Sequence, residues 1–347
     1  MQLSYEVRRG SVDHDAQSMI QVWRGHLGEP KRMEAKFQWF YRGCPYGQPL
    51  VLLLHSLPTY AVVGVGAAGR RRMRLGAREL SAGVLVDLAV ATEHRSLFPA
   101  LLLQKTMKAL GLEAFDLLYG FPNPKAAAVF QRTGYDRLAH ITRYVRVLRT
   151  APYLARRMPG FLARIAGGAA DFALAIARSA SSQSKRGLDS EWVISADARM
   201  DELWSAHLPR NALVAVRDLA FLKWRFDSAP SNRFRYFCVS GGRGKQLVAW
   251  FVCEALGDTL HVRDFWTIDS DTDLQRRFLE LLSRAALRGG YASLSIEYFG
   301  SARITAALTG AGFRPRGSRP VFSACSERLR AAGGIAAWHL TSADEDE

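Results

Sequence analysis

The nine residues from Phe37 to Pro45, FQWFYRGCP, have a counterpart 185 positions later in Leu222 to Pro230, LKWRFDSAP. Both segments place a bulky apolar residue first, a tryptophan third, an aromatic residue fifth and a proline last. Aromatic residues coincide often, so a single match of this kind carries little weight. It gains weight when further matches follow in the same order along the chain.

Two further matches do follow. Asp87-Leu88 corresponds to Asp264-Phe265, and Gly134-Tyr135 corresponds to Gly312-Phe313, at offsets of 177 and 178 positions. A slowly changing offset is what small loop deletions leave between two diverged copies. With 347 residues, the chain is long enough for two domains that each bury a core. We therefore interpret the chain as a tandem repeat of one fold.

Both copies show the same order of expected elements. In the first copy the patterns predict strands over 3–9, 50–56, 60–69, 84–90, 116–121 and from 141, and helices over 13–26, 31–42, 97–110 and 124–132. In the second copy they predict strands over 191–194, 235–239, 246–254, 259–267, 292–298 and from 313, and helices over 197–206, 218–226, 273–288 and 302–311. This order predicts an α/β protein of the α+β kind, with a mixed sheet in each copy.

Composition points to a globular protein, with 48% hydrophobic and 23% charged residues. The N-terminal residues MQLSYEVRRGSVDHDAQ lack the apolar core of a signal peptide, and no run of 18 apolar residues occurs. The four cysteines form no CxxC pair and no zinc-like spacing with histidines. We expect a cytoplasmic protein with reduced cysteines and no bound metal.

The formal net charge is +15, and the region 146–186 holds eight Lys and Arg residues against one Asp. Within it, 151–180 reads as an amphipathic helix with a basic face, interrupted near Pro159. Such a helix suits the surface of a membrane, but a connector packed on the two domains is the commoner role of such a pattern. A nucleic acid partner is less expected, because the remaining positive charge is spread along the chain.

The segment from Asp87 to Tyr135 resembles the core of the GNAT acyltransferases. It contains VDLAVATEHRSLFPALLLQKTMKAL, then a short strand, then NPKAAAVFQRTGY. The FQWFYRGCP and LKWRFDSAP segments also resemble an aromatic helix of tandem acetyltransferase-like proteins from surface-polysaccharide loci. The resemblance implies two tandem GNAT-like domains, at 1–149 and 189–330, with a basic helical linker over 150–188. An acidic tail follows over 331–347, and we expect its last residues, TSADEDE, to be frayed.

The resemblance also implies an acyl-CoA co-substrate such as acetyl-CoA, bound in the first copy. A turn between a strand and a helix directs backbone N–H groups at the pyrophosphate. The residues that match the family's binding positions are Leu88, Ala89 and Val90 on the strand, Arg95, Ser96 and Ala100 at the turn and helix, and Asn123 further on. Ser96 is placed to cap the helix. The sequence departs from the family in lacking the glycines of this turn, where it has Phe98 and Pro99.

Acyl transfer to an amine needs a group that accepts the ammonium proton. Asp87 on the central strand and Glu93 at its end are candidates, and Tyr119 is a third. Asp87 could instead be structural, because its counterpart Asp264 persists in a copy whose turn, Ile268 to Asp273, is acidic and would repel phosphates.

The resemblance implies an acyl-CoA-dependent N-acyltransferase that acts on an amino group of a sugar nucleotide or small metabolite, in surface-polysaccharide biosynthesis. Two alternatives stay open at this point. A tRNA-dependent aminoacyl transferase also pairs two GNAT-like halves and would use a basic surface. A non-catalytic scaffold or adaptor at the inner face of the membrane would use the 151–180 helix.

Overall fold

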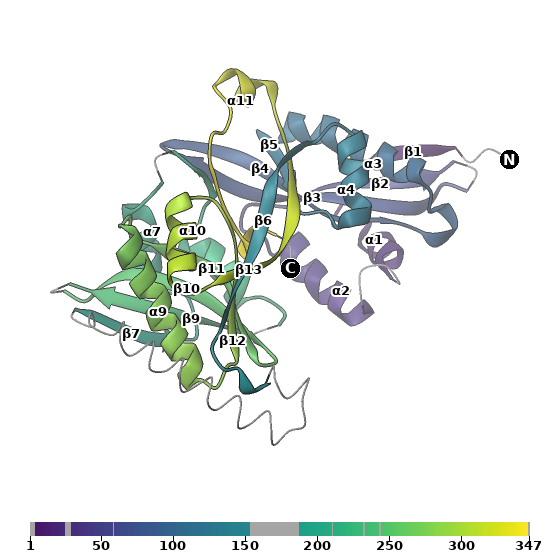
Figure 1. The fold of residues 1–347 in the computed structure, drawn as a ribbon. Helices are drawn as coiled ribbons and strands as arrows, with labels where there is room; N and C mark the ends of the chain where they lie inside the picture. The colour runs from purple at the N-terminus through teal and green to yellow at the C-terminus, as the bar shows by residue number, and fades with distance from the viewer. Residues whose placement is uncertain are drawn as a thin grey trace. The chain divides into compact units, whose positions relative to one another are not determined.

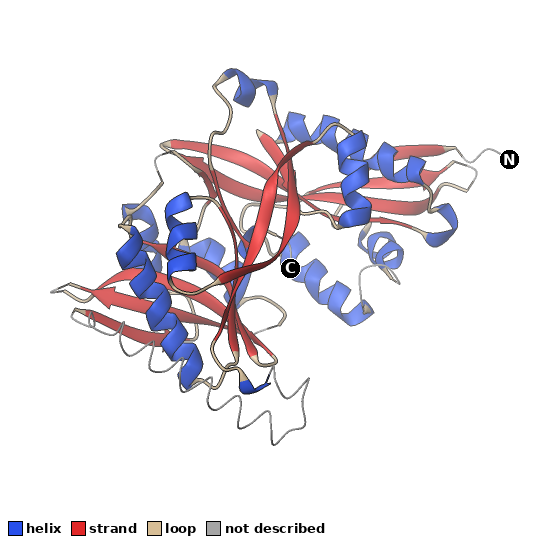
Figure 2. Cartoon of the chain, in the orientation of Figure 1, coloured by secondary structure: helices blue, strands red, loops and turns tan. Residues whose placement is uncertain are grey.

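The structure is a computed structural model that describes residues 4–24, 29–57, 59–152, 187–209, 211–231, 233–242 and 244–345. The chain divides into two compact units. Unit 1 comprises Met1–Ile141, Pro209–Asn232 and Arg319–Glu347, and unit 2 comprises Thr142–Leu208 and Arg233–Ser318. Figure 1 follows the chain by colour from the N-terminus to the C-terminus, and Figure 2 separates helices from strands. The expected linker helix over 151–180 lies almost wholly outside the described residues.

Unit 1 is built on a mixed sheet. Its strands are β1 (Tyr5–Gly10), β2 (Leu50–Ser56), β3 (Ala61–Leu75), β4 (Arg78–Val90), β5 (Leu117–Gly120) and the end of β13 (Arg314–Cys325). Strands β1 to β4 pair antiparallel, β5 joins β4 in parallel, and β13 pairs antiparallel with β5. Two short strands follow at β3: β8 (Leu213–Ala215) pairs antiparallel with β3, and β14 (Trp338–Thr341) pairs in parallel with β8.

Helices cover both faces of this sheet, as Figure 1 shows. On one side α3 (Leu97–Ala114) and α4 (Pro124–Arg132) pack over a core that includes Leu54, Leu103, Met107 and Phe130. On the other side lie α1 (Ala16–Trp23) and α2 (Pro30–Lys36), the latter continued by η1 (Phe37–Arg42). Further short helices in unit 1 are η2 (Thr92–His94), α8 (Leu219–Leu222), η3 (Lys223–Asp227), α11 (Glu327–Ala331) and η4 (Ser342–Asp344).

Unit 2 repeats the plan. Its sheet runs in the order β6, β12, β11, β10, β9, β7, formed by β6 (Asp136–Val147), β7 (Leu188–Val193), β9 (Phe234–Gly241), β10 (Gln246–Leu256), β11 (Thr259–Thr267) and β12 (Ser293–Phe299). The helices α9 (Thr272–Arg288) and α10 (Ala302–Gly310) cover one aromatic and aliphatic core. The helix α7 (Ala198–Ala206) packs on β10 and β11. The class predicted from sequence, α/β with mixed sheets, is confirmed.

The two copies exchange their last strands. β6 ends the first copy, yet its residues Thr142–Val147 pair antiparallel with β12 of unit 2. β13 ends the second copy, yet its residues Phe322–Cys325 pair antiparallel with β5 of unit 1. Each compact unit is therefore completed by a strand from the other copy. The ranges expected from sequence, 1–149 and 189–330, describe copies along the chain and stay a prediction.

The Gly-aromatic pairs that mark the repeat precede these exchanged strands. Gly134 and Gly312 have left-handed backbones, with φ of 77° and 86°. The amide of Tyr135 bonds to the carbonyl of Phe130 at 3.1 Å, and the amide of Phe313 bonds to that of Leu308 at 3.0 Å. Both pairs thus end a helix in the manner of a Schellman motif, which needs a left-handed residue and favours glycine. The pairs are retained for the fold.

The repeated segments FQWFYRGCP and LKWRFDSAP each contain a π-helix, η1 and η3 respectively, and both helices belong to unit 1. The indole N–H of Trp39 donates to the carbonyl of Trp224 at 2.6 Å, and that of Trp224 donates to the carbonyl of Trp39 at 2.9 Å. Their rings stack at 5.7 Å between centroids. The repeated tryptophans are therefore reciprocal partners, which explains why both copies keep them.

The C-terminal residues differ from the expectation of a frayed acidic tail. Trp338–Thr341 forms a buried strand, and Asp344 is completely buried. Thr341 and Asp344 form a capping box, in which the side chain of each residue accepts a hydrogen bond from the backbone amide of the other. The expectation was wrong because acidic composition was taken as a sign of solvent exposure.

Among the described residues, no helix is both long enough and apolar enough to cross a lipid bilayer.

Candidate active site

In unit 1, strand β5 runs beside β4 only briefly, because β5 ends at Gly120. Their parallel register covers only Ala82–Val84 against Leu117–Tyr119, whereas β4 continues to Val90. On its other edge β4 stays paired with β3 through Val90. Within the described residues, no strand pairs with the edge of β4 that faces β5 beyond Val84. The backbone of Leu88, Ala89 and Val90, the residues expected to bind acyl-CoA, lies on this strand end.

A β-bulge interrupts β4 at the same place. Val86 pairs with Ala67 and Ala89 pairs with Val65, so Asp87 and Leu88 together oppose the single residue Gly66. Asp87 has a left-handed backbone, with φ of 53°. A bulge of this kind changes the direction in which the strand presents its side chains and backbone groups.

The side chain of Asp87 is held by the helices on one face of the sheet. Its Oδ1 accepts from Lys36 Nζ at 2.8 Å and its Oδ2 accepts from the Tyr41 hydroxyl at 2.7 Å. Its carbonyl accepts from Trp23 Nε1 at 3.3 Å. The side chain of Asp87 is only 6% exposed, so this ion pair is largely shielded from water. Sequence reasoning found Asp87 but missed its partners, which lie 46 to 64 positions away.

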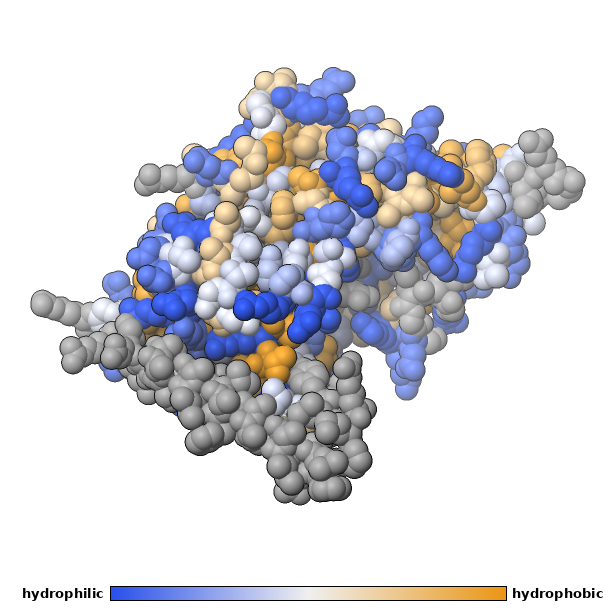
Figure 3. All heavy atoms as spheres, in the orientation of Figure 1, coloured by the Kyte–Doolittle hydropathy of each residue, from blue (hydrophilic) through white to orange (hydrophobic). Residues whose placement is uncertain are grey.

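The turn after β4 leads to the N-terminus of α3. Glu93 and Arg95 are exposed there, and Ser96 makes no side-chain capping bond, contrary to expectation. Leu97 and Phe98 are 43% and 60% exposed, and Phe98 packs beside Tyr5 at 6.3 Å between rings. Figure 3 shows apolar side chains at the surface in this part of unit 1, where α3 and β1 lie. The helix start thus offers uncapped amides framed by apolar side chains.

The equivalent turn in unit 2 is closed by its own side chains. β11 likewise continues beyond its paired register with β12, which ends at Val262 and Ile296. However, Asp271 caps α9 by accepting from the amide of Leu274 at 2.7 Å, and the Gln275 amide donates to Thr267 Oγ1 and to the carbonyl of Ile268. The helix start in unit 2 is therefore occupied by a carboxylate, which disfavours an anionic ligand.

Of two other expected residues, one has a structural role. Asn123 caps α4, and its Oδ1 accepts from the amides of Lys125 and Ala126 at 3.0 and 2.9 Å. An Asn before Pro at a helix start is a signal that the sequence does carry. Ala100 lies in the first turn of α3 and is partly buried.

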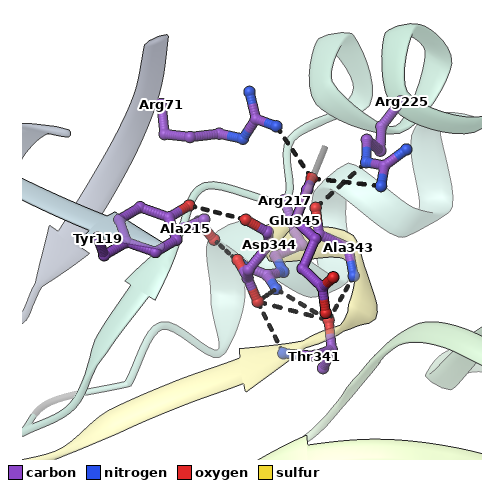
Figure 4. A network of polar contacts seen from close by, with 9 residues as sticks. All are labelled: Arg71, Tyr119, Ala215, Arg217, Arg225, Thr341, Ala343, Asp344 and Glu345. Carbon is purple, nitrogen blue, oxygen red and sulfur yellow. Dashed lines mark hydrogen bonds and ion pairs between the residues drawn. The ribbon is translucent and has the colours of Figure 1, made fainter. Parts of the chain in front are cut away.

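Tyr119 lies in a buried network around the C-terminal residues (Figure 4). Its hydroxyl donates to the carbonyl of Asp344 at 3.1 Å, and burial raises its pKa above the usual value. Arg217 Nη2 donates to Asp344 Oδ2 at 2.8 Å, and both side chains are completely buried. Arg71 and Arg225 each donate to the carbonyl of Glu345 at 3.3 Å. Tyr119 therefore has a structural partner at its hydroxyl.

The same arginines support the tryptophan pair. The guanidinium of Arg71 lies 4.9 Å from the ring centre of Trp224, and that of Arg225 lies 5.2 Å from that of Trp39. Such cation–π contacts stabilise more when they are shielded from water. A surface hollow of about 510 Å³ lies beside this stack, lined by Ala35, Gln38, Trp39, Gly43, Trp224, Ser228 and Pro230.

Sequence reasoning missed this network because its members are far apart along the chain. One local signal was present, since Thr341 and Asp344 have the spacing of a capping box. The described residues contain no group of three or more His, Cys, Asp or Glu side chains arranged to hold a metal ion.

Comparison with known proteins gives no match by sequence, either to a protein-family model or to a curated protein. Solved structures do match. A GCN5-related N-acetyltransferase from Kribbella flavida aligns with a TM-score of 0.63 at 11% identity, over 96% of this chain and 74% of that one. A GCN5-related N-acetyltransferase from Anabaena variabilis gives a TM-score of 0.61 at 12% identity, over 96% and 75%.

Saccharomyces cerevisiae N-myristoyltransferase, solved with bound myristoyl-CoA, gives a TM-score of 0.54 at 13% identity, over 93% of this chain and 79% of that one. At these identities the likeness shows the fold alone. The chain has the fold of the GNAT acyltransferases, and it matches the tandem form of N-myristoyltransferase over most of its length.

Proposed function

We propose that the protein is an acyl-CoA-dependent N-acyltransferase with one acyl-CoA site, in unit 1. The observation that carries this proposal is the unpaired edge of β4 beyond Val84, which is followed along the chain by the start of α3, a start that Ser96 does not cap. In unit 2 the corresponding helix start is capped by Asp271. The fold shared with acyltransferases supports the same conclusion.

In this proposal the unpaired edge of Leu88, Ala89 and Val90 binds the pantetheine amides in the manner of an added strand. The first-turn amides of α3 and the side chain of Arg95 bind the pyrophosphate. Pro99 lacks an N–H group, so α3 offers fewer backbone donors than a glycine-rich turn would. Arg95 therefore carries a larger share of the binding energy.

The acceptor that we propose is an amino group on a sugar nucleotide or small metabolite, with acetyl-CoA as donor. The amine nitrogen bonds to the thioester carbonyl carbon, the carbon–sulfur bond breaks, and the CoA thiolate leaves. Glu93 is exposed in η2, just after β4, and is the carboxylate that we propose takes the ammonium proton. A role in polysaccharide biosynthesis and a cytoplasmic location are parts of the same hypothesis.

Isothermal titration of the full chain with acetyl-CoA tests the proposal. We expect one site per chain, and we expect Arg95→Glu to weaken binding by about tenfold or more, because a cation at the phosphate becomes an anion. Arg328→Glu is the matched control, since Arg328 is an exposed arginine on α11. Absence of binding, or equal affinities of wild type and Arg95→Glu, would overturn the proposal.

Transfer itself is measured by release of CoA thiol in the presence of amines. We expect release with amino sugars and their nucleotides and none with the matching hydroxyl sugars. Release that does not depend on an amine would identify a thioesterase instead of an N-acyltransferase.

A further inference from the structure

We infer that Asp87 is a positioning residue that fixes the bulge of β4, and that Lys36 and Tyr41 hold it in place. In this role Asp87 sets the direction of the strand end that binds the acyl donor, and the proton is taken elsewhere. The inference rests on the proposed function, because that function defines what the strand end binds.

The backbone of Asp87 supplies the first argument. Among the described residues, the other non-glycine residues with positive φ are Tyr60 and Lys245, and both lie in turns. Asp87 lies inside a strand, where a left-handed residue is strained unless its surroundings impose it. Asp is among the residues that tolerate this conformation best.

The surroundings do impose it. Oδ1 of Asp87 accepts from Lys36, Oδ2 accepts from Tyr41, and the carbonyl accepts from Trp23. These donors come from α2, η1 and α1 respectively. Three elements thus fix one residue of the bulge. Both carboxylate oxygens are therefore already bonded to donors of the protein.

The bulge in turn separates the two faces of β4. The side chain of Asp87 turns to α2 and η1, whereas Leu88 packs with the core under α3, and its methyl group lies 3.7 Å from where a Cβ of Gly66 would be. A change in φ at Asp87 would rotate Leu88, Ala89 and Val90 relative to β3. Lys36 and Tyr41 therefore act on the site through Asp87.

Three substitutions at one position separate this role from proton transfer. Asp87→Asn keeps the shape and tolerates positive φ, Asp87→Gly keeps only the freedom to adopt it, and Asp87→Ala keeps neither. We expect kcat of the Asp87→Asn and Asp87→Gly variants to stay within about tenfold of wild type. We expect kcat of Asp87→Ala to fall at least about tenfold below that of Asp87→Gly. We expect the affinity for acetyl-CoA to fall together with kcat in Asp87→Ala, because the strand end that Asp87 orients binds the donor, and the acid limb of the pH–rate profile to persist in Asp87→Asn.

Asp264 provides the matched control, because it is the counterpart of Asp87 and has no positive φ. The melting temperature of the Asp264→Gly variant should be no higher than that of Asp264→Ala. A glycine variant should therefore outperform the alanine variant only at position 87. Melting temperatures of all variants identify those that fail to fold. Rescue of a Lys36→Met loss by Lys36→Arg tests the clamp at its other end.

Two results would overturn the inference. If Asn, Gly and Ala at position 87 are equally inactive while folded, and the acid limb is lost, Asp87 takes the proton. If all three equal wild type, Asp87 has no role in positioning. Failure of the proposed function looks different, because wild type itself would then neither bind acetyl-CoA nor transfer its acyl group.

Discussion

Arg217 and Asp344 show at the scale of single residues how the C-terminal segment is held. Both side chains are fully buried, and Asp344 also accepts from the amide of Thr341 at 2.7 Å. Removing one partner of such a pair leaves the other charge buried without compensation. We expect Arg217→Met to lower the free energy of unfolding by about 3–5 kcal/mol.

Denaturant unfolding measures this change. The double variant Arg217→Met/Asp344→Asn should recover part of the loss, because Asn is neutral and can still accept from Thr341. If the double variant is less stable than Arg217→Met alone, the buried charge is not the cause of the loss.

His339 predicts a dependence of stability on pH. It is buried in β14, and burial together with the nearby Arg217 lowers its pKa from 6.5 to about 3. The folded state therefore holds His339 neutral, whereas the unfolded state takes up a proton below pH 6.5. Stability from this residue is fully present above that pH and is lost as pH falls toward 3, by up to about 1.4 kcal/mol per pH unit.

The measurement is the midpoint of chemical unfolding between pH 7.5 and 5. We expect the slope to be smaller in His339→Leu than in wild type. Equal slopes in the two proteins would show that other groups cause the acid sensitivity.

At the scale of elements, the two π-helices depend on one another through their tryptophans. Each indole donates to the partner's carbonyl, and the rings stack. We expect Trp39→Phe and Trp224→Phe each to destabilise by about 1–3 kcal/mol, because each leaves a carbonyl without its donor. A double-mutant cycle should give a coupling energy of about 0.5–3 kcal/mol. Additive losses would contradict the reciprocal arrangement.

The end of α10 provides a second test at this scale. Gly312 has φ of 86°, whereas Gly317 on β13 has no left-handed backbone and an open site for a Cβ. We expect Gly312→Ala to destabilise by about 1–2 kcal/mol. Gly317→Ala, as the control, should change stability little. Equal effects in thermal unfolding would show that backbone conformation is not what retains Gly312.

At the scale of the whole molecule, strand exchange makes each unit depend on both copies. The first copy alone, 1–149, lacks β13, β8 and β14, which complete the sheet of unit 1. We expect this fragment to be largely unfolded by circular dichroism, because an unpaired sheet edge and an open core are costly. Mixed with 187–347, it should regain native ellipticity. Cooperative folding of 1–149 by itself would show that the exchanged strands are dispensable.

Much of this architecture was predictable from local pattern. The strands 50–56 and 259–267 and the helix 124–132 were predicted with the bounds that the structure shows, because their apolar periodicity and end signals are local. The short elements β8, α11 and β14 were missed, since three to five residues carry too little pattern. The sequence pointed to the strand that carries Asp87. It did not point to Lys36, Tyr41 and Trp23 as partners of Asp87, because only packing brings them together.

The sequence by itself determined the repeat, the order of elements and the class of fold, because periodicity, helix ends and matched positions are read along the chain. Only the tertiary structure decided which copy supplies the last strand of each unit and what the repeated tryptophans do. It also decided that the acidic C-terminus is buried, because Arg71, Arg217 and Arg225 can bind it only after residues more than 100 positions apart have come together. The local sequence pattern specifies the helices and strands, whereas the side-chain contacts between distant residues form only when the chain packs.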